Sequence, residues 1–377
     1  MDIGLYIHVP FCLQKCRYCD FVSYPYNKDD ARSYLQALER EMQYYARRLT
    51  PGRRVSTVFI GGGTPTVLET GDLTKLLENA RRYFQWSEDA EVTVEANPGT
   101  INKHKLYMLH QMGVNRLSLG VQAYQSRLLN LLGRVHDYRQ VLQGVSAARQ
   151  VGFNNLNLDL IFGIPGQSLK DWQESLAMLA DLQPEHLACY SLQLEEGTPL
   201  AAAVERGEVT PCREELELKM YNKLIDFLTA RGYRHYEISN FSKPGCQCRH
   251  NLLYWHNGEY LGLGPAAHSH LDMQRWSNTA SIRQYTGQVL KNVPPVTERH
   301  KLTKKDVMIE TAFMGLRLLQ GLDRNEFYRR FGQRITDVWP EEVKKLCHQG
   351  LLELTDTHLR LTGKGLRLAN LVFREFV

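Results

Sequence analysis

Three cysteines near the start of the chain are spaced closely enough to bind one metal centre. Cys12, Cys16 and Cys19 follow the pattern C-x3-C-x2-C, in a loop that Pro10 opens after a short apolar segment. Three thiolates on one loop can hold three irons of a [4Fe–4S] cluster, whereas ferredoxin-type clusters normally take four cysteines. The fourth iron then keeps an open coordination position, as catalytic metal sites do. That iron could chelate the amino and carboxylate groups of S-adenosylmethionine, and electron transfer could then cleave the sulfonium.

A zinc site and unrelated cysteines are the alternatives for this loop. Zinc would need a fourth ligand nearby, which His8 or Asp20 could supply. Eight cysteines in 377 residues are too few for a disulfide framework and fit a reducing compartment. Cys246 and Cys248 form a C-x-C pair that is more typical of two buried thiols than of a metal site. The spacing of the first three cysteines favours the iron–sulfur cluster.

Three consecutive glycines, Gly61 to Gly63, end a second apolar segment and precede Thr64 and Pro65. Because glycine has no Cβ, backbone N–H groups can approach a ligand closely there. A tight turn from strand to helix also needs glycine, so the run alone is weak evidence. Beside the cysteine loop it becomes a candidate for the site that holds the methionyl amino group of the cofactor.

Four polar residues end or follow later apolar segments, namely Glu95, Gln122, Arg134 and Asp159. A carboxylate such as Glu95 can accept a hydrogen bond from a ribose hydroxyl or an ammonium group, and an internal salt bridge is the alternative. Asp159 lies inside an apolar segment, where an unpaired carboxylate is costly. Arg134 is its natural partner, so an Arg134–Asp159 ion pair is the structural alternative to cofactor binding.

A segment rich in histidine and aromatic residues lies between positions 237 and 290. It contains the run His250-Asn251-Leu252-Leu253-Tyr254-Trp255 and, further on, His268 and His270. A histidine beside a Tyr-Trp pair offers an axial nitrogen for iron and flat faces for a porphyrin. The alternative is a buried aromatic corner with a hydrogen-bonded histidine. We take His250 as the first-choice heme ligand, and His268 or His270 could serve instead.

The elements that position these residues alternate between short apolar strands and amphipathic helices over the first 240 residues. This alternation predicts a parallel sheet with right-handed crossovers, and six such units make a partial (β/α)6 barrel. Chemistry in such barrels takes place at the carboxyl ends of the strands, where each motif above falls. The predicted strands are Leu5–Val9, Thr57–Ile60, Glu91–Glu95, Arg116–Val121, Leu156–Ile161 and His186–Leu192, and the predicted helices include Asp30–Arg48, Asp72–Phe84, Lys103–Gln111, Tyr138–Gln150 and Leu169–Leu182.

The pattern changes after Tyr236, and we expect three parts: a barrel over residues 1–236, a connecting segment over 237–291 and a mostly helical region over 292–377. Asn292–Pro295 reads as a linker. A hairpin of Leu351–Thr355 and His358–Thr362 is predicted near the end of the chain. Helices followed by a hairpin suggest a winged-helix-like module, whose mixed charges favour a packing or lid role over DNA binding.

Composition excludes several classes of protein. The chain is 43% hydrophobic and 23% charged, which are ordinary values for a soluble globular protein. It has no apolar run near 18 residues, and its first twelve residues have no basic region or cleavage site, so we expect a cytoplasmic protein. The net charge of +5 is spread along the chain, without the basic stripe of a nucleic-acid-binding protein. A monomer or a dimer is expected.

Together these motifs make the sequence similar to the radical S-adenosylmethionine superfamily, through C-x3-C-x2-C and the aromatic Tyr18 just before Cys19. The opening Leu5–Cys12 resembles the first strand of the coproporphyrinogen oxidase-like branch, and the resemblance covers nearly the whole chain. It implies that Tyr6, Gly62, Glu95, Gln122, Arg134 and Asp159 contact S-adenosylmethionine, and Tyr18, Gly63 and Thr64 complete the predicted cofactor-binding set.

Two departures from that branch point away from decarboxylation of coproporphyrinogen. The oxidases place a fourth cysteine two residues after the third, where this chain has Phe21, and they carry an N-terminal extension that is missing here. The run HNxxYW instead resembles that of heme chaperones in the same branch. This implies a protein that binds heme and passes it to acceptor hemoproteins, which could include membrane-associated respiratory proteins. Oxygen-independent coproporphyrinogen oxidation and methyl transfer with two cofactor molecules are the alternatives.

Overall fold

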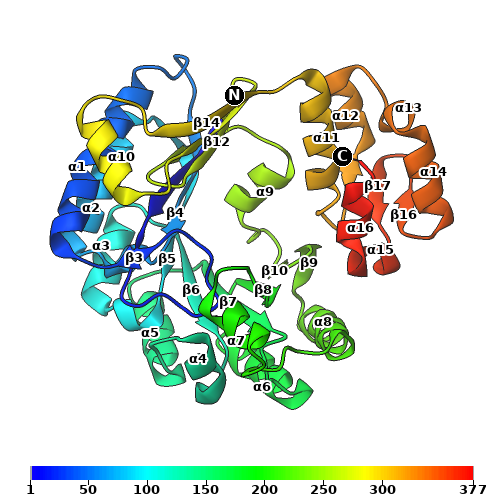
Figure 1. Cartoon of the computed structure of the whole chain (residues 1–377), viewed down its shortest axis with the longest axis horizontal. Coiled ribbons are helices and arrows are strands. Elements are labelled where there is room, and N and C mark those ends of the chain that lie inside the picture. Colours follow the sequence, from blue (N-terminus) through cyan, green and yellow to red (C-terminus); the bar gives the residue numbers. More distant parts are fainter. Residues whose placement is uncertain (1, 377) are drawn as a thin grey trace.

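The chain folds into an open barrel-like sheet wrapped by helices, with a separate helical region at the C-terminal end (Figure 1). This computed structural model describes residues 2–376. Twelve strands form one sheet in the order β14-β13-β12-β11-β1-β4-β5-β6-β7-β8-β10-β9. The six strands from β1 to β8 in this order pair in parallel. The partial (β/α)6 barrel expected from the sequence is confirmed.

All six predicted strands are present, with ends within a few residues of those expected, and helices connect them. Polar residues begin several helices: Asp137 and Ser168, for example, each form a capping box with the third residue of the helix that follows. The barrel elements are β1 (Ile3–Val9), β2 (Phe11–Cys12), β3 (Tyr24–Pro25), α1 (Lys28–Ala46), β4 (Val55–Gly62), α2 (Thr70–Tyr83), β5 (Trp86–Ala96), α3 (Lys103–Gln111), β6 (Arg116–Gln122), α4 (Ser126–Leu132), α5 (Tyr138–Gln150), β7 (Leu156–Phe162), α6 (Leu169–Ala180), β8 (His186–Ser191), α7 (Pro199–Glu205) and α8 (Glu214–Thr229).

Alternation along the strands divides the side chains between a hydrophobic core and a polar interior. On β7, Leu156, Leu158 and Leu160 belong to the main core, which lies between the sheet and the outer helices. Because successive side chains in a strand point to opposite faces, Asn157 and Asp159 point into the barrel instead. The same alternation applies to the other barrel strands, and it gives the interior face Tyr6, His8, Thr57, Phe59, Glu91, Thr93, Glu95, Arg116, Ser118, Gln122, Asn157, Asp159, His186 and Tyr190.

The segment after the barrel extends both edges of the sheet. β9 and β10 continue it beyond β8, while β11 pairs in parallel with β1 and is followed by three antiparallel strands. The expected linker at Asn292–Pro295 is instead a turn that leads into β14, which pairs with β13. The elements are β9 (Arg234–Glu237), β10 (Asn240–Ser242), α9 (Arg249–Trp255), β11 (Tyr260–Leu263), β12 (His268–Leu271), β13 (Gln274–Asn278), α10 (Ile282–Leu290) and β14 (Val296–Lys301).

The C-terminal region has its own hydrophobic core and a small three-stranded sheet. The predicted hairpin is confirmed as β16 and β17. The elements are α11 (Lys304–Gly315), β15 (Leu322–Asp323), α12 (Arg324–Phe331), α13 (Ile335–Val338), α14 (Pro340–His348), β16 (Leu352–Leu354), β17 (His358–Leu361), α15 (Gly363–Arg367) and α16 (Ala369–Arg374). Among the helices of residues 2–376, none is long and apolar enough to cross a membrane.

Candidate functional site at the barrel mouth

One cavity at the carboxyl ends of the barrel strands brings together most of the predicted site residues. All three cysteines of the loop line it, and so do eight further predicted residues: Tyr18 of the same loop and seven from the strands and loops that follow it in sequence. Of the predicted set, only Tyr6 and His250 are missing from its walls. The lining residues are Cys12, Leu13, Gln14, Cys16, Tyr18, Cys19, Phe21, Ser23, Gly62, Gly63, Thr64, Glu95, Ala96, Asn97, Thr100, Ser118, Gly120, Gln122, Gly133, Arg134, Val135 and Asp159.

The cysteine loop is clamped by backbone hydrogen bonds to two helices that are distant in sequence. The Arg17 N–H donates to the carbonyl of Leu132, at the end of α4, over 2.9 Å, and the Arg17 carbonyl accepts from the Leu200 N–H of α7 over 2.8 Å. Tyr18 packs against a small apolar cluster that includes Leu129 and Leu200. Tyr18 therefore anchors the loop as well as lining the cavity.

The three thiols face one cavity but do not form a site for a single ion. Within residues 2–376, no three side chains of His, Cys, Asp or Glu converge as the ligands of one metal ion do. His8, a candidate fourth zinc ligand, uses one ring nitrogen with the Tyr6 hydroxyl at 3.0 Å and the other with the carbonyl of Val22 at 2.8 Å. Burial raises the pKa of the Cys19 thiol to about 11 and so disfavours the thiolate, which is the form that binds metal. A cation beside the thiols offsets this effect by stabilising their ionised form.

Arg134 supplies such a cation. Its Nη1 lies 3.4 Å from Cys16 Sγ, and its Nη2 donates to the carbonyl of Gly120 over 2.5 Å. Among the described residues, no ion pair joins Arg134 to Asp159, which was the alternative to cofactor binding, because the guanidinium is directed to the sulfur and the carbonyl. Arg134 Nε is buried without a partner in this part of the chain. It is a free donor next to the thiols.

The glycine run is explained by close contacts inside the protein. A Cβ on Gly61 would lie 2.7 Å from Glu95 Oε2, and one on Gly63 would lie 2.5 Å from the carbonyl oxygen of Phe11. The N–H of Gly62 donates to Glu95 Oε2 over 3.2 Å, and that of Gly63 donates to the carbonyl of Val9 over 2.9 Å. The N–H groups expected to face a ligand are thus already paired, and the run brings the Glu95 carboxylate up to the backbone.

Two partly buried carboxyl groups, Glu95 and Asp159, stand on the interior face and line the same cavity as the cysteines. Burial and the neighbouring charge of Asp159 raise the pKa of Glu95 to about 8. Burial also raises the pKa of Asp159 to about 6, although Asn157 Nδ2 donates to Asp159 Oδ1 over 2.6 Å and stabilises the charged form. Such perturbed carboxyl groups in a cavity are a sign of a functional site. A cationic ligand would be stabilised here by both groups.

Gln122 lies at a bulge that ends β6. The register of β6 against β7 shifts between Gly120 and Gln122, and Gln122 has φ of 73°, in the left-handed region. A non-glycine residue in this region is strained, and such strain gathers at ligand sites. The bulge turns the Gln122 side chain into the cavity.

Tyr6 and His250 lie deeper in the barrel than predicted. Tyr6 is two residues before His8 on β1, and its hydroxyl is bonded to that histidine. His250 is 1% exposed, and hydrogen bonds join its Nδ1 to Thr57 Oγ1 and its Nε2 to the Tyr254 hydroxyl, each at 2.8 Å. Burial lowers the pKa of His250 to about 3. With both nitrogens used inside the protein, His250 is not placed to bind heme iron, and it fits the buried aromatic corner.

The helix that carries HNxxYW closes the amino-terminal end of the barrel. Glu91, on β5, accepts the backbone N–H groups of Arg249 and His250, each over 3.0 Å. The His250 ring stacks on Phe59 of β4 at 5.2 Å between centroids. The motif thus forms part of the amino-terminal end of the barrel.

The other two histidines considered as heme ligands differ in exposure. His270 is buried with Nδ1 3.1 Å from the Gly258 carbonyl, whereas His268 is exposed on β12. Cys248 is buried and Cys246 partly so.

Ser118 and Asn97 line the cavity but were not predicted as site residues from the sequence. Ser118 Oγ lies 2.8 Å from Asn157 Nδ2 and 3.4 Å from Asp159 Oδ2. It precedes Gln122 by four residues on β6, so counting in steps of two from Gln122 would have placed it on the interior face. Asn97 follows the end of β5 and has no such periodic signal.

Comparison with known proteins identifies the family. Radical SAM superfamily sequences match residues 6–179, and the HemN C-terminal domain matches residues 302–368. The chain is 37% identical to heme chaperone HemW of Bacillus subtilis, covering 99% of this chain and 98% of that protein. The chain belongs to the HemW family. HemW of Escherichia coli is 33% identical over 100% of this chain and 98% of its own. The chain is also 34% identical to a mitochondrial radical S-adenosyl methionine domain-containing protein of Bos taurus. That match covers 96% of this chain and 84% of the Bos taurus protein.

The fold of this HemW family member is also that of a solved enzyme. Coproporphyrinogen III oxidase (HemN) from Escherichia coli, a radical SAM enzyme, superposes with a TM-score of 0.88 at 26% identity, covering 100% of this chain and 90% of that one. The shared fold includes the C-terminal region, because the superposition spans the whole chain.

Proposed function

We propose that this chain is a heme chaperone that binds heme and transfers it to acceptor hemoproteins, aided by a [4Fe–4S] cluster and S-adenosylmethionine. The observation that supports this most is the similarity to proteins named heme chaperone HemW, which runs from one end of the chain to the other. Phe21 supports it as well, since it stands at the cavity wall where the oxidases place a fourth cysteine.

The chemistry of the residues that line the cavity supports binding of the two cofactors. We assign Cys12, Cys16 and Cys19 as ligands of three irons, because all three thiols line it. When bound, the cluster supplies the electron that cleaves the sulfonium of S-adenosylmethionine in this superfamily. In the same cavity Glu95 and Asp159 can stabilise a cationic ligand, and the unpaired Nε of Arg134 can donate to a carboxylate or hydroxyl group. Gln122 adds a neutral amide to the cavity wall.

Each protein group then has a distinct task. Arg134 stabilises negative charge on Cys16, since its Nη1 lies 3.4 Å from that sulfur. Thr64, whose Oγ1 is 3.7 Å from Cys12 Sγ, positions the first thiol. Glu95 holds a proton at neutral pH in the free chain, because its pKa is raised to about 8, and releases it when a cation binds beside it.

Heme binding and transfer test the proposal directly. The full chain, reconstituted anaerobically with iron and sulfide, is titrated with heme while the Soret band is followed, and apomyoglobin is then added as an acceptor. We expect saturation at about one heme per chain and the appearance of holomyoglobin. Absence of saturable binding would overturn the chaperone proposal. Consumption of coproporphyrinogen III with S-adenosylmethionine and dithionite would favour the oxidase alternative, which the likeness to HemN supports.

The assignment of Cys12, Cys16 and Cys19 as cluster ligands is tested separately, with two other cysteines as controls. Replacing Cys12, Cys16 and Cys19 together by alanine should abolish bound iron and sulfide and the visible absorption of the cluster. Cys212→Ala and Cys347→Ala remove thiols of similar partial burial that do not line the cavity, and we expect both to keep full iron content. A triple variant with unchanged iron and sulfide would refute the assignment.

A further inference from the structure

We propose that heme binds in a groove between the last barrel strand and the C-terminal helices, beside the cofactor cavity and not at HNxxYW. This inference rests on the proposed function and gives it a location. The groove, which we call the α8–α16 groove, has a volume of about 830 Å3. This lies within the range of about 300–1,000 Å3 typical of ligand pockets. Its walls include the end of β8, one face of α8, Arg317 and residues 366–371 around the start of α16.

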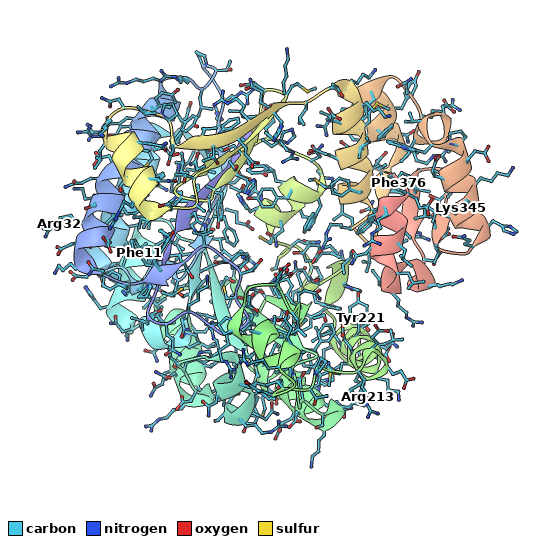
Figure 2. The ribbon with its side chains drawn as sticks, viewed as in Figure 1. Phe11, Arg32, Arg213, Tyr221, Lys345 and Phe376 are labelled. Carbon is cyan, nitrogen blue, oxygen red and sulfur yellow. The ribbon has the colours of Figure 1, made fainter. Side chains whose placement is uncertain are left out.

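The groove gathers apolar side chains that the fold leaves exposed. Leu218 of α8, Leu371 of α16 and Leu368, just before α16, are 42%, 52% and 40% exposed, although leucine is normally buried. Tyr190, at the end of β8, is 42% exposed and turns toward the barrel interior. Tyr221 of α8 (Figure 2) stacks on Phe162 with 6.0 Å between ring centroids. Flat aromatic and leucine surfaces on facing walls suit a planar apolar ring.

Arg317 and Arg367 give the groove a cationic wall, and the guanidinium of Arg317 also packs over the Trp255 ring, with 4.5 Å from its Cζ to the ring centroid. Within residues 2–376, neither Arg317 nor Arg367 forms an ion pair, and Arg317 Nε is buried without a hydrogen-bond partner. Arginine binds carboxylates well because its guanidinium donates two parallel hydrogen bonds. Heme carries two propionate groups, so the apolar ring and the anionic edge of one ligand match the leucine and arginine surfaces of one groove.

The facing wall is acidic and orients the ligand. Glu214 and Glu217 stand on the first turns of α8, where Glu217 Oε1 accepts a hydrogen bond from Ser191 Oγ over 2.5 Å. Propionates would be repelled there and attracted to the arginines of the C-terminal region. A ligand without carboxylates would lose this preference.

The groove lies close to the cofactor cavity and contains no histidine among its lining residues. Tyr190 pairs in register with Ile161, which follows Asp159 of the cofactor cavity by two residues on the neighbouring strand. Bound heme would therefore lie beside the cofactor cavity, on the side that Asp159 lines. Because no imidazole faces the groove, we infer that the ring faces and the propionates, and not the iron, provide most of the affinity.

Four surface variants of the full, cluster-containing chain test the location. Arg367→Glu and Leu371→Glu change exposed groove residues, while Arg334→Glu and Leu354→Glu make the same changes at exposed positions of the C-terminal region outside it. Heme affinity is measured by Soret titration. We expect each groove variant to bind heme at least tenfold more weakly, and each control to bind as the unchanged chain does.

Two further ligands distinguish the contribution of the iron to heme affinity from that of the propionates. Protoporphyrin IX, which lacks iron, should bind about as tightly as heme, and heme dimethyl ester should bind more weakly and be insensitive to Arg367→Glu. If the unchanged chain binds heme saturably but the groove variants are unaffected, the groove is wrong and the chaperone proposal stands. Selective loss of binding in His256→Ala, which alters a separate cavity beside Trp255, would also refute the groove. If the unchanged chain does not bind heme, the chaperone proposal itself fails.

Discussion

The guanidinium of Arg134 lies 3.4 Å from the sulfur of Cys16, measured from Nη1 to Sγ, although 118 residues separate the two along the chain. The loop after α4 carries Arg134 back to the cysteine loop, and the hydrogen bond from Arg17 N–H to Leu132 fixes the same approach. The fold of the barrel therefore holds the positive charge of Arg134 beside the cysteine thiols.

Loss of the Arg134 charge should make the bound cluster harder to reduce. In Arg134→Gln the cation that stabilises the more negative, reduced form is gone, so we expect the reduction potential to fall by about 60 mV, which is a tenfold change for one electron. Arg134→Lys should keep part of the effect. Anaerobic redox titration measures the potential, with Arg139→Gln, an exposed arginine five residues later, as the control. Equal potentials in Arg134→Gln and Arg139→Gln would contradict this role.

Glu95→Gln should stabilise the cofactor-free chain at alkaline pH. Burial raises the pKa of Glu95 from 4.5 to about 8 in the folded chain, so ionisation favours the unfolded state and stability falls as pH rises from 4.5 through 8. Glutamine keeps an acceptor for the Gly62 N–H but does not titrate. We expect the variant to gain more than about 1 kcal/mol in free energy of unfolding at pH 8, and much less at pH 5.

Urea unfolding at both pH values measures this difference. The same variant should bind S-adenosylmethionine more weakly, because the counter-charge for a cationic ligand is lost. A variant that is both unchanged in stability at pH 8 and unchanged in cofactor affinity would show that Glu95 faces neither a low-dielectric site nor the cofactor.

His250→Ala should destabilise the fold without changing heme affinity. The change leaves a cavity next to Phe59 and removes the partners of Thr57 and Tyr254, which together should cost about 3 kcal/mol. His268→Ala, at an exposed position of β12, is the matched control and should be neutral. Urea unfolding and Soret titration report the two properties. Intact stability with lost heme binding would restore His250 as a heme ligand.

The same histidine should make stability depend on pH. Its pKa is lowered from 6.5 to about 3 on folding, so the unfolded chain binds an extra proton between these values and stability falls as pH drops through this window. Between pH 7 and pH 5 this contributes a loss of about 2 kcal/mol. His250→Gln removes the titrating group and keeps an amide for hydrogen bonding. Its unfolding free energy should therefore fall less than that of the unchanged chain over this range, and parallel curves would argue against the assignment.

The barrel and the cysteine loop could be predicted because their signals are local. Apolar runs such as Leu156–Ile161 mark strands, and a carboxylate inside such a run, as at Asp159, must point into the interior of the barrel. The loop cysteines are close in sequence and therefore close in space. The residues that these patterns marked meet in one cavity, apart from Tyr6 and His250.

The errors concern partners that are distant in sequence. For Arg134 an ion pair with Asp159 was left open as the alternative to cofactor binding, and nothing in the sequence shows that Cys16 and Gly120 lie nearer to its guanidinium. His250 could not be placed, since its contact with Thr57 joins residues 193 positions apart. The strands from β11 to β14 were missed because their glycines and polar residues interrupt the alternation that marks a strand.

The pairing of β1 with β11 has a consequence for the order of events when the chain is made. β1 carries the cysteine loop at its end, yet one of its two edges stays unpaired until Tyr260–Leu263 have been synthesised. An exposed strand edge is a template for wrong association. A nascent chain of some 250 residues would thus hold its three cluster-binding cysteines on an unfinished sheet. Loading of iron before that point would take place on a strand still open to misfolding, and protection at this stage would have to come from outside the chain.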